Sequence, residues 1–177
     1  MRTLVLGGIR SGKSRWAETA IARSAGTGQP VHYLATGVVT GDDADWSARV
    51  AAHRERRPPH WSTVETGDVA AQLRAHGETA TLVDDVGGWL AAVLDRRAAW
   101  SGGSVSADVD DLVDAVGGFG SPLALVSPEV GLTVVPATAA GRRFADELGA
   151  LNQRLATVCE RVVLVVAGQP VSIKEQR

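Results

Sequence analysis

The apolar residues of this chain fall into short, nearly continuous runs, and longer segments of helical periodicity separate the runs. The runs predict strands at 3–6, 31–35, 81–84, 123–127 and 161–166. Apolar positions three or four residues apart predict helices at about 13–24, 43–56, 68–75, 88–99, 107–117 and 141–158. Strands that are apolar on both faces and alternate with helices indicate an α/β fold, with a mostly parallel central sheet flanked by helices.

The composition favours a single folded domain and argues against nucleic acid or an anionic membrane as a partner. With 45% hydrophobic residues, the 177-residue chain can bury one substantial core, so we expect a single domain over 1–177. A net charge of −2 provides no excess of positive charge for a nucleic acid or an anionic membrane. The single cysteine, Cys159, excludes an intramolecular disulfide. We expect a cytoplasmic protein, because we find neither a signal peptide nor an apolar stretch of membrane-spanning length.

A glycine-rich loop between the first predicted strand and the first predicted helix carries the clearest chemistry. It matches the phosphate-binding pattern G-x-x-x-x-G-K-[ST] with the sequence Gly7-Gly8-Ile9-Arg10-Ser11-Gly12-Lys13-Ser14. In such loops the backbone N–H groups and the positive end of the following helix hold a polyphosphate. Lys13 would reach the β- and γ-phosphates, and the Ser14 hydroxyl would bind Mg²⁺. We predict a nucleoside triphosphate site; the alternative is an ordinary glycine-rich turn that opens a helix.

A second acidic element is expected in a protein with this loop. It would be a carboxylate at the end of a strand beside the first one, where it holds Mg²⁺ directly or through water. The run Thr81-Leu82-Val83 is followed by Asp84 and Asp85. We predict that Asp84 is the residue that binds Mg²⁺, and Asp85 is the second candidate. The alternative is that one or both carboxylates cap the following helix. The loop and this strand together predict a P-loop NTPase fold of the RecA-like type.

A histidine among arginines lies on the helix predicted at 43–56. Arg49 shares a helix face with His53, and Arg54, Arg56 and Arg57 follow closely. This can be a solvated helix face. It can also be a nucleophilic site, because a neutral imidazole attacks phosphorus while neighbouring guanidinium groups bind the phosphate oxygens.

The class of P-loop protein is narrowed by what the sequence lacks. The only asparagine is Asn152, so the Asn-Lys-x-Asp guanine motif of signalling GTPases is absent. A small-molecule kinase that uses only the P-loop stays open, and so does a nucleotide-binding regulator without catalysis. The histidine segment is the sequence feature that would distinguish an enzyme with a covalent intermediate from these two alternatives.

Motifs spread along nearly the whole chain resemble one enzyme family. Besides the loop, they are Tyr33-Leu34-Ala35-Thr36, Arg49-x-x-x-His53-x-x-x-Arg57-Pro58-x-x-Trp61, Leu82-Val83-Asp84, Glu129-Val130-Gly131, Val135-Pro136, Gly149-x-Leu151-Asn152-Gln153-Arg154-Leu155-Ala156 and Val165-Val166-Ala167-Gly168-x-Pro170 with Lys174. In this combination the sequence resembles the bifunctional adenosylcobinamide kinases/adenosylcobinamide-phosphate guanylyltransferases of cobalamin biosynthesis.

The resemblance implies two reactions. ATP or GTP would phosphorylate the hydroxyl of the aminopropanol arm of adenosylcobinamide, a corrinoid. The residue guanylylated in the family falls on His53, which would take GMP from GTP and pass it to the new phosphate, giving adenosylcobinamide-GDP. Lys13, Ser14, Mg²⁺ and Asp84 would serve phosphoryl transfer. The resemblance also implies a homotrimer.

The nucleotide-binding residues that we expect are Gly7, Gly8, Ile9, Arg10, Ser11, Gly12, Lys13, Ser14, Arg49, Arg54, Arg57 and Asp84.

The chain departs from the family's usual pattern at three positions. Pro128 stands where the family has Asn, Ala145 where it has Arg, and Asp85 where it has Cys or a small polar residue.

Overall fold

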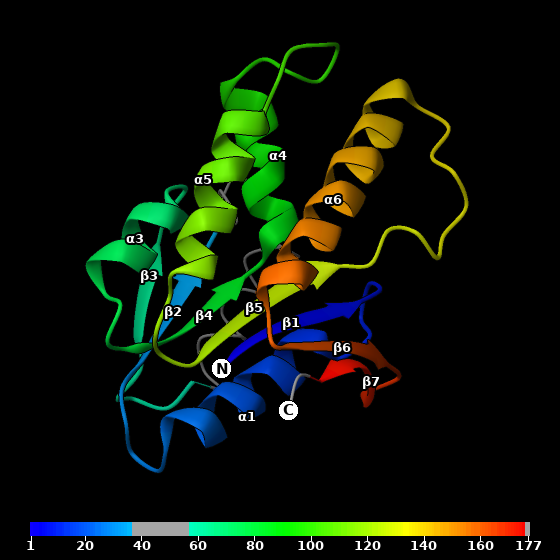
Figure 1. The fold of residues 1–177 in the computed structure, drawn as a ribbon. Coiled ribbons are helices and arrows are strands. Elements are labelled where there is room, and N and C mark those ends of the chain that lie inside the picture. Colours follow the sequence, from blue (N-terminus) through cyan, green and yellow to red (C-terminus); the bar gives the residue numbers. More distant parts are fainter. Residues whose placement is uncertain (37–56, 176–177) are drawn as a thin grey trace.

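A computed structural model describes residues 1–36 and 57–175. Seven strands form one sheet in the order β3-β2-β4-β5-β1-β6-β7 (Figure 1). Neighbouring strands are parallel except for β6 and β7, which form an antiparallel hairpin. The strands are β1 (Arg2–Gly7), β2 (Val31–Ala35), β3 (Ser62–Glu65), β4 (Ala80–Asp84), β5 (Leu123–Pro128), β6 (Arg161–Val166) and β7 (Gln169–Glu175).

Helices cover both faces of the sheet, as the sequence predicts. Helix α1 lies on one face, and α3, α4, α5 and α6 lie on the other (Figure 1). Their bounds are α1 (Lys13–Ala25), α3 (Val69–Ala75), α4 (Val86–Arg96), α5 (Ser106–Gly117) and α6 (Ala139–Val158). The predicted α/β fold with a mostly parallel sheet is confirmed. The helix predicted at 43–56 lies entirely outside the described residues.

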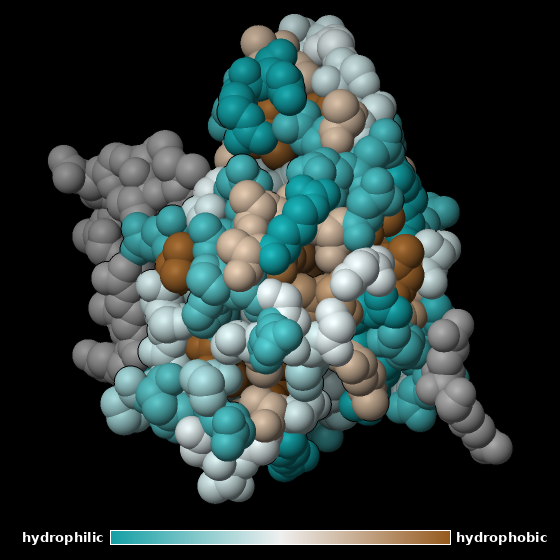
Figure 2. Space-filling model, turned by 60° about the vertical axis from the view of Figure 1, so that its left-hand side comes forward, coloured by the Kyte–Doolittle hydropathy of each residue, from teal (hydrophilic) through white to brown (hydrophobic). Residues whose placement is uncertain are grey.

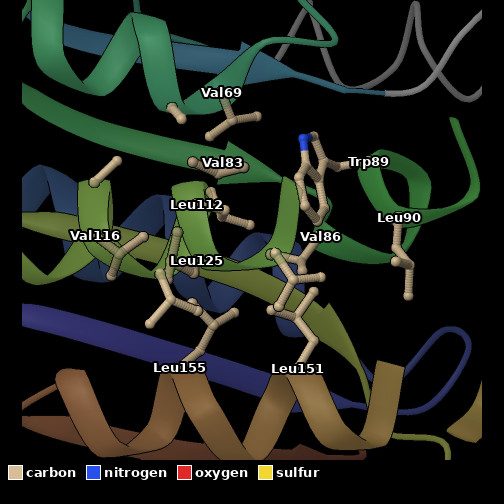
Figure 3. Packing of buried hydrophobic residues seen from close by; sticks show 14 of the residues in the cluster. Val69, Val83, Val86, Trp89, Leu90, Leu112, Val116, Leu125, Leu151 and Leu155 are labelled. Carbon is tan, nitrogen blue, oxygen red and sulfur yellow. The ribbon is translucent and has the colours of Figure 1, made fainter. Parts of the chain in front are cut away.

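The larger core lies between the sheet and the four helices. Leu151 and Leu155 of α6 point toward the residues of α5 and β5 that Figure 3 labels, and Val86 of α4 lies beside them. Cys159 is buried in the same cluster, and burial raises the pKa of its thiol to about 12. The thiol therefore stays protonated at neutral pH and acts as a small core residue.

The outer surface mixes polar and apolar residues. On the face shown in Figure 2, hydrophobic residues appear as small separate patches among hydrophilic ones. Among the helices that the structure describes, none has both the length and the apolar character needed to cross a membrane.

Two strands were not predicted, and both lie at the edges of the sheet. Strand β3 has a single apolar residue, Val64, and its other residues are exposed. Strand β7 begins with Gln169 and Pro170, and proline interrupts a ladder of hydrogen bonds unless it lies on an edge strand. Helix α4 begins two residues earlier than predicted, because Asp85 caps it ahead of the glycine pair Gly87-Gly88.

An ion pair joins the first strand to the connection between α6 and β6. Arg2 donates to Glu160 from its backbone N–H and from its guanidinium, whose Nε lies 2.9 Å from Oε1. The side-chain hydrogen bond from Arg2 lowers the pKa of Glu160 from 4.5 to about 2. Because this pKa is lower in the folded than in the unfolded chain, the ionised carboxylate stabilises the fold above pH 4.5. That stabilisation is lost as the pH falls toward 2.

We therefore expect Glu160→Gln to flatten the acid dependence of stability. Between about pH 6 and about pH 3, wild type should lose more free energy of unfolding than the variant, as measured by urea denaturation at each pH. Exposed Glu175, which pairs with Arg161, offers a matched control, because the Glu175→Gln variant should follow the wild-type profile. Parallel profiles for wild type and Glu160→Gln would contradict the prediction.

Candidate active site

The glycine-rich loop joins β1 to α1 at the carboxyl edge of the sheet, and its backbone permits little substitution. A Cβ on Gly7 would lie 2.4 Å from Ser11 Oγ and 2.8 Å from the Val165 carbonyl oxygen, so only glycine fits there. Gly12 has φ +92°, a conformation that favours glycine. The loop closes on itself through a bond of 3.2 Å from the Ser11 N–H to the Gly8 carbonyl.

The turn between β6 and β7 supports the loop from outside. The Gly168 N–H donates to the Ser11 carbonyl at 2.7 Å, and a Cβ on Gly12 would lie 3.1 Å from Gly168 Cα. Ala167 and Gly168 both have positive φ, which produces the tight turn that brings them here. Sequence reasoning gave these two residues no role, although they belong to one of the motifs that carry the resemblance.

Lys13 is the first residue of α1 and extends back over the loop. Its Nζ lies 3.3 Å from the Gly8 carbonyl oxygen. Gly12, at the N-cap, has no side chain to occupy the first N–H groups of the helix. Backbone N–H groups of a first helical turn, the positive end of a helix and an ammonium group in one place form an anion site. The loop residues thus have the arrangement expected for binding a polyphosphate.

Ser14 and Asp84 meet across the sheet edge. The Ser14 hydroxyl donates to Asp84 Oδ1 at 3.3 Å. The strand of Asp84 was predicted to lie beside the first strand, and that detail is wrong, because β5 lies between β1 and β4. Asp84 still reaches Ser14, because α1 packs against both β4 and β5 and brings the hydroxyl across the intervening strand.

Tyr33 fixes the other oxygen of Asp84. Its hydroxyl donates to Asp84 Oδ2 at 2.5 Å, and its ring is buried in the core. Burial, followed by the charge of Asp84, raises the pKa of Tyr33 above its usual value, so the hydroxyl remains a donor. From the sequence, Tyr33 is only part of a motif, because nothing local predicts a contact with a residue 51 positions away.

The sequence left open whether Asp84 and Asp85 bind a metal or cap the following helix, and in the structure the two residues have different partners. Asp85 accepts a hydrogen bond from the Gly88 N–H at 2.6 Å and so caps α4. Burial raises the pKa of the Asp85 carboxyl, and the bond from Gly88 opposes that rise. Thr36 donates from Oγ1 to the Asp85 carbonyl and holds the same turn. The cap is therefore Asp85, while Asp84 faces the loop.

The donor set of Ser14 and Asp84 fits a hard cation such as Mg²⁺. Both supply oxygen, and magnesium in nucleotide sites is held by one or two protein oxygens together with phosphates and water. No group of three or more His, Cys, Asp or Glu side chains that could hold a metal occurs in residues 1–36 and 57–175. The pair would supply two of the cation's oxygen ligands, and the phosphates of a bound nucleotide would supply others.

Arg57 lies close to this group. Its guanidinium carbon is 3.4 Å from the centre of the Tyr33 ring, and Nη1 donates to Thr63 Oγ1 at 2.9 Å. It also lines an open cavity of about 560 Å³ with Trp61 and Glu65. Arg57 therefore adds a positive charge beside Tyr33, which binds Asp84. The other candidates of that segment, Arg49, His53 and Arg54, lie outside the described residues.

Known proteins match this chain from end to end. The family model described as "Cobinamide kinase / cobinamide phosphate guanyltransferase" matches residues 3–173. The chain is 41% identical over 179 residues to the "Bifunctional adenosylcobalamin biosynthesis protein CobP" of Pseudomonas aeruginosa, with 98% of each chain covered. It is 33% identical over 195 residues to the "Bifunctional adenosylcobalamin biosynthesis protein CobU" of Escherichia coli, with 98% of this chain and 100% of the relative covered.

Proposed function

The chain belongs to the cobinamide kinase / cobinamide phosphate guanyltransferase family, and we propose that it catalyses both reactions of that name in cobalamin biosynthesis. The acceptor is adenosylcobinamide in the first reaction and its phosphate in the second. ATP or GTP supplies the phosphoryl group, and GTP supplies GMP. The observation that carries the proposal is the phosphate loop with Lys13 at the start of α1 and Ser14 within reach of Asp84.

Phosphoryl transfer needs placement and charge more than covalent help from the protein. The hydroxyl oxygen of the acceptor bonds to the γ-phosphorus, the bond from that phosphorus to the bridging oxygen breaks, and the nucleoside diphosphate leaves. The hydroxyl proton passes to solvent. Lys13 and the loop N–H groups hold the phosphates. Mg²⁺, bound at Ser14 and Asp84, would neutralise charge on the phosphate oxygens.

Guanylyl transfer is assigned to His53. Its imidazole nitrogen bonds to the α-phosphorus of GTP, and pyrophosphate leaves as the bond to the bridging oxygen breaks. A phosphate oxygen of the acceptor then attacks the same phosphorus, and the phosphorus–nitrogen bond breaks to restore the histidine. Arg49, Arg54 and Arg57 would bind the nucleotide phosphates. Support comes from the family and from the place of Arg57 beside Tyr33.

We further propose that the protein works as a cytoplasmic homotrimer built from one domain, residues 1–177. The support is the family resemblance together with the composition, whose net charge of −2 favours neither nucleic acid nor anionic membranes. Light scattering after size-exclusion chromatography would measure the mass, and a monomeric mass would overturn the trimer.

Intact-protein mass spectrometry after incubation with GTP and Mg²⁺ tests the proposed chemistry. Wild type should gain the mass of one guanylyl group (GMP less one water) in an acid-labile form, and His53→Ala should gain none. His60→Ala is a matched control, because this histidine is exposed and should leave the adduct intact. Binding of GTP without any adduct on wild type would overturn guanylyl transfer and leave a kinase or a nucleotide-binding protein.

A further inference from the structure

A second cavity lies on the sheet face opposite to α1. It occupies about 650 Å³ between the loop that follows β5, the helix α6 and the hairpin of β6 and the edge strand β7. Leu6 of β1 and Val162 of β6 form its floor, and both pack in the core cluster that α6 covers. Its volume is that of a typical small-molecule site. The residues given a role so far, namely the phosphate loop, Tyr33 and Arg57, do not line this cavity.

Motif residues from separate parts of the chain converge on the cavity. Glu129, Val130 and Gly131 line it from the loop after β5, together with Pro136. Gly149, Asn152 and Gln153 line it from α6. All belong to segments on which the resemblance to the family depends, and neither phosphate binding nor the histidine chemistry accounts for them.

The cavity adjoins the phosphate loop, and buried hydrogen bonds hold its wall. The Glu129 N–H donates to the Gly7 carbonyl at 3.1 Å, so the loop after β5 starts beside the phosphate loop. Asn152 accepts a bond from the Ser127 hydroxyl at 2.6 Å and donates to the Pro128 carbonyl at 3.0 Å. Asn152 is buried, and these bonds fix α6 against the end of β5.

The lining matches a broad ligand that is both apolar and rich in amides. Val135 and Ile173 line the cavity although they are 74% and 60% exposed, so a large ligand would cover apolar surface that water now contacts. Gln153 and Asp146 line it with exposed side chains, an amide and a carboxylate, of a kind that can hydrogen-bond to the amides of a ligand. A corrinoid is a wide ring whose rim carries methyl and amide-bearing side chains.

We propose that this cavity binds the corrinoid acceptor and directs its hydroxyl-bearing arm toward the phosphate loop. The inference rests on the proposed function and deepens it. One part of the ring rim lies against α6 and β7, and the nucleotide lies beyond Gly7 on the loop. Donor and acceptor then approach the same edge of the sheet from opposite sides of β1.

Gly149 offers a test that fills the cavity without disturbing the helix. A Cβ at Gly149 meets nothing within 4 Å, so leucine there projects into open space. Leucine also favours a helix by about 1 kcal/mol relative to glycine. Ala150→Leu is the matched control, because Ala150 is the next residue of α6, is exposed and does not line the cavity.

Three quantities should be measured on wild type and both variants. They are the Kd for GTP, the rate of GMP adduct formation without acceptor, and the Kd for adenosylcobinamide by equilibrium dialysis. Gly149→Leu should weaken corrinoid binding about tenfold or more and raise the KM for the acceptor in parallel. Its GTP affinity and adduct formation should stay at the wild-type level, and Ala150→Leu should match wild type throughout.

Wild-type corrinoid affinity in Gly149→Leu would overturn the inference. Weakened GTP binding in that variant would also overturn it, because the cavity would then belong to the nucleotide. Should Gly149→Leu fail to fold, Gln153→Ala removes an exposed cavity amide and should weaken corrinoid binding about threefold. Absence of the adduct on wild type contradicts only the guanylyl transfer, since equilibrium dialysis measures the cavity directly.

Discussion

Lys13→Ala is expected to lower both phosphorylation of the acceptor and guanylylation by about 10³-fold. The ammonium group extends over the phosphate loop, where it reaches the Gly8 carbonyl, and a polyphosphate bound there would replace that contact. Both reactions develop charge on phosphate oxygens in the same loop, so one cation serves both. Initial rates with saturating GTP and separate single-turnover adduct formation measure the two losses.

Arg15→Ala is the control for a general loss of positive charge. Arg15 lies two residues further along α1, about 200° around the helix, and its side chain is exposed. It should keep both rates within about twofold of wild type. Lys13→Arg is the sharper comparison, because it keeps the charge but replaces a compact ammonium by a planar fork. Full activity in Lys13→Arg would contradict a point-charge role for Lys13.

The parts of the site that lie close together in sequence could be predicted from the sequence. Gly7 to Ser14 form one loop between a strand and a helix, so the local pattern was enough to assign them. The strand that carries Asp84 was also found, because its apolar run ends in two acidic residues. The neighbour of this strand in the sheet was not predicted correctly, because an apolar run of this kind can pair equally well with several other strands.

The supporting contacts depend on residues far apart in the chain. Tyr33 reaches Asp84 only because β2 and β4 are neighbours, and strand order cannot be read from periodicity. Gly168 reaches Ser11 through the turn before β7, an edge strand whose Pro170 weakens any strand signal. The loop chemistry was therefore predictable, while the residues that hold it in place required the fold.

The different roles of Asp84 and Asp85 predict a second large effect, on turnover, when Asp84 is substituted. Asp84→Asn should lower Mg²⁺-dependent turnover by about 10²-fold or more, because it removes the negative charge that faces Ser14. Affinity for GTP measured with EDTA present should change little, since the loop and Lys13 bind the phosphates without the metal. A rise in the Mg²⁺ concentration needed for half-maximal rate would show that the loss acts through the metal.

Asp85→Asn is the matched control, because asparagine caps helices about as well as aspartate and also removes one charge. Asp85 accepts from the Gly88 N–H, and an asparagine oxygen can accept the same bond. This variant should keep its turnover within a few fold of wild type and its Mg²⁺ requirement unchanged. An equal loss in Asp85→Asn, or an unchanged Mg²⁺ requirement in Asp84→Asn, would contradict the assignment. Because the two carboxylates are adjacent in sequence, their different partners produce the contrast: Ser14 and Tyr33 contact Asp84, whereas Gly88 donates to Asp85.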